Sequence, residues 1–123
     1  MSKGMNKNTS IKIIKMIQGI GSEVDWNNKK NKQFVEAILN LKNADEAKRF
    51  LRDIMTEKEI NEFSNRLEAA SLLSKDVQYN AIIENNGLSS TTVARISKWL
   101  KGNSGGYRLI LPRLVNHHHT TKP

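Results

Sequence analysis

Hydroxyl and basic side chains cluster between residues 89 and 101, and they are the clearest set of chemical groups in this sequence. Ser and Thr fill the four positions from 89 to 92, and Arg95, Lys98 and Lys101 follow at intervals of three residues. The hydroxyls can donate and accept hydrogen bonds, and the cations can bind anionic oxygens. Because no activated nucleophile or acid–base pair accompanies them, the segment predicts binding of a polyanion and not catalysis.

Two short helices that meet at Gly87 are expected to position these side chains. Residues 78 to 101 read QYNAIIENNGLSSTTVARISKWLK. Gly87 can adopt the positive φ of a tight turn, and Leu88 can fill the corner between the helices. The apolar face of the second helix consists of Val93, Ile96, Trp99 and Leu100. This spacing leaves the hydroxyl and basic residues on the opposite face.

The pattern is typical of a helix-turn-helix that contacts duplex DNA. Ser89 or Ser90 can cap the second helix, and short hydroxyl side chains in its first turn can approach phosphates and base edges closely. We expect the following residues to contact DNA: Tyr79, Asn80, Ser89, Ser90, Thr91, Thr92, Arg95, Lys98 and Lys101. An ordinary helical hairpin with a solvated polar face is the alternative interpretation.

The charge of the chain agrees with a polyanionic partner. Its 123 residues include 20 Lys and Arg against 12 Asp and Glu, which gives a net charge of +8. Residues 77 to 115 contain five basic residues and one acidic residue, whereas residues 43 to 76 are slightly acidic. The helix-turn-helix region is therefore basic, although charge alone would also suit RNA or an anionic membrane surface.

Composition argues against several other classes of protein. The sequence has no Cys, so it cannot form a disulfide, a thiolate zinc site or a cysteine nucleophile. Lys12, Lys15 and Gln18 interrupt the apolar residues between positions 11 and 20, so we expect no membrane span and a cytoplasmic location. The acidic residues suit helix caps and helix surfaces, and we predict neither an enzyme nor a bound cofactor.

We expect one helical domain with a tail at each end. Residues 1 to 32 are rich in Lys and Asn and predict a basic, partly disordered arm. The domain itself occupies residues 33 to 115 and contains the helix-turn-helix at 78 to 101. Residues 116 to 123 include His117 to His119 and predict a flexible tail without a physiological metal site.

Three helices are expected before the helix-turn-helix. The apolar face of the first consists of Phe34, Val35, Ile38 and Leu39. Asn43 with Glu46, and Thr56 with Glu59, form capping boxes that start the second and third helices. Residues 108 to 115, RLILPRLV, are expected to form either a short strand or a docked terminal segment.

The order of these features resembles the Trp-repressor-like family, in particular its YerC/YecD-type branch. The resemblance rests on segments between Phe34 and about Leu114: AILNLK, MTEKEINEFSNRL, NGLSSTTVARIS and GNSGGYRLIL. It implies a sequence-specific transcriptional regulator, a repressor, built as an all-α intertwined homodimer. Such a dimer presents two recognition helices to successive major grooves of double-stranded DNA.

The resemblance also implies a place for a small-molecule effector. Thr56, Arg66, Thr92 and Arg95 correspond to the residues that form the corepressor site of the tryptophan-responsive member. Two guanidinium groups could hold a planar ring or a carboxylate, and the Thr hydroxyls could bind the remaining polar groups. Ile96 stands where that member has Gly, and its side chain would fill the space of an indole. Tryptophan is therefore not the expected effector.

Two other functions fit the sequence less well. A helical dimerisation or adaptor module that binds another protein would have similar helices but no salt-dependent affinity for DNA. An RNA-binding protein would need aromatic side chains along an exposed surface, whereas Trp99 is expected to pack on the apolar face of its helix. A DNA-binding regulator is the leading hypothesis.

Overall fold

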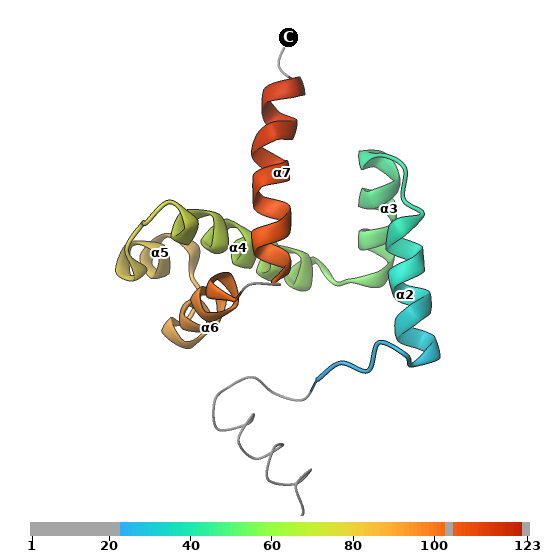
Figure 1. The fold of residues 1–123 in the computed structure, drawn as a ribbon, viewed down its shortest axis with the longest axis horizontal. Helices are drawn as coiled ribbons and strands as arrows, with labels where there is room; N and C mark the ends of the chain where they lie inside the picture. The colour runs from blue at the N-terminus through green and yellow to red at the C-terminus, as the bar shows by residue number, and fades with distance from the viewer. Residues whose placement is uncertain (1–22, 103–104, 122–123) are drawn as a thin grey trace, which may run out of the picture. The chain divides into compact units, whose positions relative to one another are not determined.

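The described part of the chain is helical throughout. The computed structural model describes residues 23–102 and 105–121, with side chains up to residue 115. The helices of this part are α2 (Lys29–Leu39), α3 (Ala44–Ile54), α4 (Glu57–Ser74), α5 (Tyr79–Asn86), α6 (Ser90–Lys101) and α7 (Gly106–Thr121) (Figure 1). No described residue lies in a strand, which confirms the predicted all-α fold. The chain divides into two units, residues 1–50 and 51–123.

The first described helix begins earlier than the sequence predicted. α2 starts at Lys29 and not at residue 33. The side-chain oxygen of Asn28 accepts hydrogen bonds from the backbone N–H groups of Lys30, at 2.9 Å, and Asn31, at 3.2 Å. This cap starts the helix inside the polar run NNKKNK, where no apolar periodicity indicated one. The predicted arm was therefore too long at its C-terminal end, and its residues 1–22 lie outside the described residues.

The apolar face of α2 is largely exposed. The Phe34 and Phe50 rings lie 6.2 Å apart, centroid to centroid, and join α2 to α3. No residue of α2 is buried, and Leu39 is 77% exposed. A helix with so much uncovered apolar surface lacks the burial that normally stabilises an amphipathic helix.

Side-chain caps start α3 and α4, as the sequence predicted. The Glu46 N–H donates to the Asn43 side chain at 2.9 Å, and the Glu46 carboxylate accepts from the Lys42 N–H at 3.0 Å. At α4 the box is complete: the Glu59 N–H donates to the Thr56 hydroxyl at 3.1 Å, and the Thr56 N–H donates to the Glu59 carboxylate at 2.9 Å. These bonds satisfy N–H groups that have no partner inside the helix.

The core of the second unit joins α4, α5 and α6. Its buried apolar residues are Ala69, Ala70, Ile82, Val93 and Ile96. The two alanines allow the backbones of α5 and α6 to approach the second half of α4, where both helices lie beside it (Figure 1). Residues 57–68 of α4 include no buried residue, and Phe63 there is 44% exposed. The helix-turn-helix is thus anchored by the C-terminal part of a longer helix.

Of the two alternatives predicted for residues 108–115, the structure excludes the short strand: the segment is a helix that docks on the core through Leu111. α7 continues past the expected domain boundary at residue 115 to Thr121 and contains Pro112. Tyr107 and Leu111, one helical turn apart, both pack against the core cluster. Burial of this pair favours a helix even though Pro112 removes one backbone hydrogen bond.

Candidate nucleic-acid interface

The turn between α5 and α6 has the geometry that the sequence predicted. Gly87 adopts φ 67° and ψ 15°, and its N–H donates to the Ile83 carbonyl at 3.2 Å. This left-handed conformation ends α5. Leu88 is partly buried against the core cluster and fills the corner between the two helices.

Ser89 is the residue that caps α6. Its hydroxyl oxygen accepts from the Thr92 N–H at 3.1 Å and donates to the Thr92 hydroxyl at 2.9 Å. The cap leaves Ser90 and Thr91 exposed in the first turn of α6. Thr92, by contrast, is partly buried and its hydroxyl already has a partner, so it is less available to DNA than its neighbours.

The buried face of α6 differs from the prediction at one position. Val93 is fully buried and Ile96 is 3% exposed, but Trp99 is 50% exposed. Ser97, only 7% exposed, faces the core in its place. On a helix, positions 97 and 100 lie on the same side as position 93, whereas position 99 points away from it. The expectation that Trp99 packs on the apolar face is therefore wrong.

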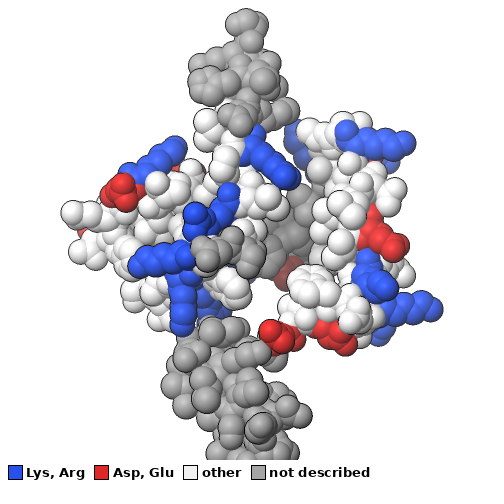
Figure 2. All heavy atoms as spheres, viewed as in Figure 1, with Lys and Arg blue, Asp and Glu red and all other residues white. Residues whose placement is uncertain are grey.

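The polar face of α6 is exposed and basic. Arg95, Lys98 and Lys101 are all exposed, and so are Tyr79 and Asn80 at the start of α5. Lys and Arg side chains gather over α6 and the beginning of α7 in Figure 2. Of the nine residues predicted to contact DNA, all except Thr92 are exposed.

The four residues of the predicted effector site each have a local structural role or face solvent. Thr56 caps α4, Thr92 is bonded to Ser89, and Arg95 is exposed. Arg66 donates to Glu62 at 2.9 Å, and its guanidinium carbon lies 5.2 Å from the centroid of the Phe63 ring. The side chain of Ile96 is buried in the core cluster. An effector at these residues stays a prediction.

Tyr107 is partly buried and was not among the predicted site residues. Burial raises the pKa of its phenol above the ordinary value of 10.0, and the positive charge of Arg66 opposes this shift. The first turn of α7 therefore lies within electrostatic reach of α4. The Arg66 Nε is buried and has no hydrogen-bond partner among the described residues. Only the helical spacing of Tyr107 and Leu111 could have indicated this packing from sequence.

Two further features concern metals and membranes. Among the side chains of residues 23–102 and 105–115, no three His, Cys, Asp or Glu groups lie together as metal ligands would. The side chains of His117 to His119 lie outside the described residues. None of the helices that the structure describes is both long enough and apolar enough to cross a membrane.

The fold and the exposed face of α6 define an all-α protein with a helix-turn-helix. The family model for "Trp repressor protein" matches residues 29–115, and the chain belongs to this family. It is 33% identical over 82 residues to "Uncharacterized protein YerC" of Bacillus subtilis (strain 168), an alignment that covers 67% of this chain and 79% of the relative. A crystal structure of a TrpR-like protein from Eubacterium eligens ATCC 27750 is similar with a TM-score of 0.65 at 36% identity, covering 72% of this chain and 92% of the other.

Proposed function

We propose that this protein is a sequence-specific DNA-binding transcriptional regulator that inserts α6 into the major groove. The observation that carries the proposal is the division of α6 into two faces. Val93 and Ile96 fix the helix against the core, while Ser90, Thr91 and Arg95 face solvent together with the lysines at its C-terminal end. Hydroxyl groups near the N-terminus of such a helix suit phosphates and base edges, and Arg95 suits a bidentate contact with guanine.

Membership of the Trp repressor family supports the same proposal. The family description names a repressor, and we propose repression as the outcome of DNA binding. A cytoplasmic location belongs to this proposal, because chromosomal DNA lies in the cytoplasm of bacteria such as the organism of the YerC relative.

We propose further that the regulator acts as a homodimer. α2 has no buried residue and exposes Phe34, Ile38 and Leu39, and α7 exposes Leu109 to more than half of its area. Apolar surface of this extent is normally covered in a stable protein. A symmetric dimer would cover it and would present two copies of α6 to a palindromic site.

The experiment that tests this function is selection of duplexes from a random library, followed by fluorescence anisotropy on the selected duplex. We expect preference for a palindrome over competitor DNA, and an affinity that falls steeply as salt rises because phosphate contacts release counterions. Equal affinity for selected and random duplexes would refute sequence specificity. Salt-independent binding to a protein partner, with no binding to DNA, would support the adaptor function instead.

Arg95→Ala tests the proposed reading face within the same assay. Loss of one bidentate base contact should weaken binding by at least about 1 kcal/mol and relax the preference at one base pair. Arg49→Ala is the matched control, because Arg49 is exposed on α3 and pairs with Asp45, itself exposed, at 3.7 Å. If both variants bind the selected duplex like the unmodified protein, Arg95 does not contact a base.

A further inference from the structure

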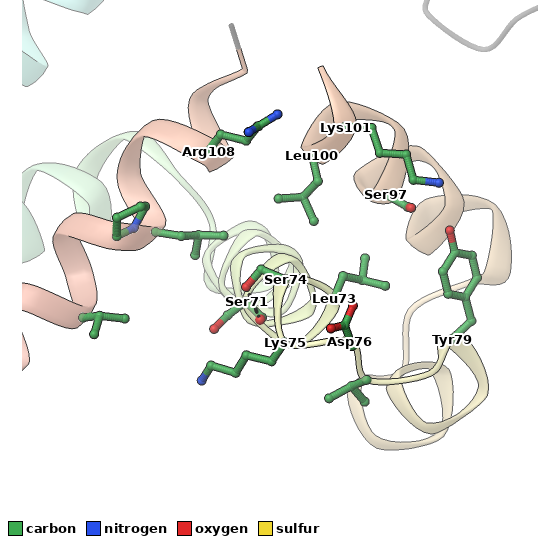
Figure 3. A pocket seen from close by; sticks show the side chains of 14 residues that line it. Ser71, Leu73, Ser74, Lys75, Asp76, Tyr79, Ser97, Leu100, Lys101 and Arg108 are labelled. Carbon is green, nitrogen blue, oxygen red and sulfur yellow. Dashed lines mark hydrogen bonds between the residues drawn. The ribbon is translucent and has the colours of Figure 1, made fainter. Parts of the chain in front are cut away.

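A cavity of about 800 Å³ lies among α4, α5, α6 and α7 (Figure 3). Its volume falls within the range of small-molecule binding sites. None of the four residues predicted for an effector lines it, so it is a separate place on the molecule. Its apolar lining consists of Leu73, Val77, Leu100, Leu111, Pro112 and Val115.

Three cations from separate segments line the same cavity. Lys75 ends α4, Lys101 ends α6, and Arg108 lies in the first turn of α7. Asp76 is the one carboxylate among the lining residues, so the charged groups leave an excess of positive charge. No ion pair within 4.0 Å engages any of the three cations in the part of the chain that the structure describes. Their charges are therefore available to a ligand.

Hydroxyl groups add directional hydrogen bonding to this positive charge. Ser97 and Tyr79 both line the cavity, and Figure 3 shows them on the same side as Lys101. Arg108 already donates to the Gly102 carbonyl, at 3.4 Å, which leaves most of its N–H groups for another acceptor. The cavity thus combines an apolar wall with cations and hydroxyls at its edge, as sites for small amphipathic molecules commonly do.

We propose that this cavity binds a small organic anion with an apolar body and an acidic head group. The head group lies against Lys101 and Arg108, with Lys75 adding positive charge, and the apolar body lies against Leu100 and Leu111. A neutral molecule of the same shape would gain only the apolar contacts. An inorganic anion would gain only the charged ones.

Binding has a consequence for DNA, which rests on the proposed function. Lys101 is expected to contact a phosphate, and a ligand head group would compete for the same ammonium group. The ligand would also join the C-terminal end of α6 to α7. We therefore expect the organic anion to lower affinity for DNA.

The test uses 2-naphthylacetate as the probe, with its uncharged amide and inorganic phosphate as comparisons. Each compound is titrated into the full-length, ¹⁵N-labelled protein in the absence of DNA. Binding is followed by the changes in NMR chemical shift of the backbone amides. The carboxylate should bind at least about tenfold more tightly than the amide, equivalent to one charged contact of about 1.4 kcal/mol. Its shifts should centre on the residues that line the cavity.

Charge-removing variants complete the test. In the double variant Lys75→Gln with Arg108→Gln, the preference for the carboxylate should fall to less than about threefold. Lys58→Gln, at an exposed position of α4, should leave the preference unchanged. Dispersed amide spectra confirm that each variant is folded. Three outcomes would each overturn the proposal. The carboxylate and the amide could bind with equal affinity, or the chemical shift changes could centre on other residues. A second copy of the chain could also fill the cavity, so that no probe binds.

The effect on DNA is measured separately, with the selected duplex and increasing 2-naphthylacetate. A lower affinity for the duplex supports the competition at Lys101. Unchanged affinity, with the anion bound in the cavity, overturns the competition while the binding site stands. Failure to bind any duplex would instead refute the proposed function, and the titrations without DNA would still decide whether the cavity binds the anion.

Discussion

Replacing Gly87 with Ala tests whether α5 and α6 meet in the conformation described above. Gly87 has φ 67°, a region where an L residue with a Cβ atom is strained. The strain amounts to about 1–2 kcal/mol for one residue. An added Cβ would meet no atom within 4 Å, so steric overlap adds nothing to this cost. We expect Gly87→Ala to destabilise the protein by about 1–2 kcal/mol.

Replacement of glycine by alanine changes stability in opposite directions at positive and at negative φ. Where a glycine has an ordinary negative φ, replacement by Ala stabilises a protein by about 0.4–1 kcal/mol, because the unfolded chain loses freedom. Gly106 supplies the matched control: it begins α7, has no strained φ, and its added Cβ would also meet no atom within 4 Å. Gly87→Ala and Gly106→Ala should therefore shift stability in opposite directions.

Urea unfolding followed by circular dichroism measures both variants. For a slope of about 1–2 kcal/mol per molar urea, Gly87→Ala should lower the midpoint by roughly 0.5–2 M. All proteins are compared at one concentration, because the midpoint of a dimer depends on concentration. Gly87→Asn should recover part of the loss, since Asn tolerates the left-handed conformation. A stability equal to or above that of the unmodified protein for Gly87→Ala would refute the left-handed turn.

Three other outcomes are expected. Thr56→Ala should lower the free energy of unfolding by about 1 kcal/mol, because the cap of α4 is lost. The hydrogen bond from the Thr56 N–H lowers the pKa of Glu59, so the stabilisation by that carboxylate is present above about pH 4.5 and is lost as pH falls through the lowered pKa. Thermal unfolding of the unmodified protein between pH 3 and 6 would measure this loss of stability. The raised pKa of Tyr107 predicts the opposite sign at high pH, with stability lost as pH rises above about 10; this loss should be smaller in Tyr107→Phe, and equal alkaline profiles for the two proteins would contradict it. Ile82→Val, at a fully buried position, should destabilise by about 0.5–1.5 kcal/mol in urea, and a neutral effect would contradict its place in the core.

Local chemistry explains which parts of the fold were predictable. The capping box of Thr56 with Glu59 and the glycine at position 87 depend on neighbouring residues only, and both have the predicted geometry. The helix start at Asn28 depends on a cap as well, but it lies in a polar run that contains three Asn residues, each able to act as a cap. Periodicity could not choose among them.

Tertiary packing explains the rest. α7 contains Pro112 and follows a glycine-rich segment, both of which argue against a helix when only local preference is considered. The packing of Tyr107 and Leu111 against residues far away in sequence decides in favour of the helix. Similarly, α6 turns Ser97 toward the core and Trp99 toward solvent. Residue type alone would favour the opposite, with Trp buried and Ser exposed.

The candidate DNA contacts were accessible to sequence reasoning because they lie on one short helix. Their spacing within α6 fixes which of them share a face. The cavity beside Arg108 was not accessible, because its lining residues come from four helices separated along the chain. Only the fold makes Lys75, Lys101 and Arg108 part of the lining of one cavity.

The uneven burial of α4 has a consequence for motion within the protein. Its C-terminal part is held by Ala69 and Ala70, whereas residues 57–68 include no buried residue. Backbone amides of residues 57–68 should therefore exchange with solvent through small local openings, while those near the alanines require larger ones. Any partner that covers Phe63 would reduce these openings, and the added order would extend along the same continuous helix toward the residues that hold α5 and α6.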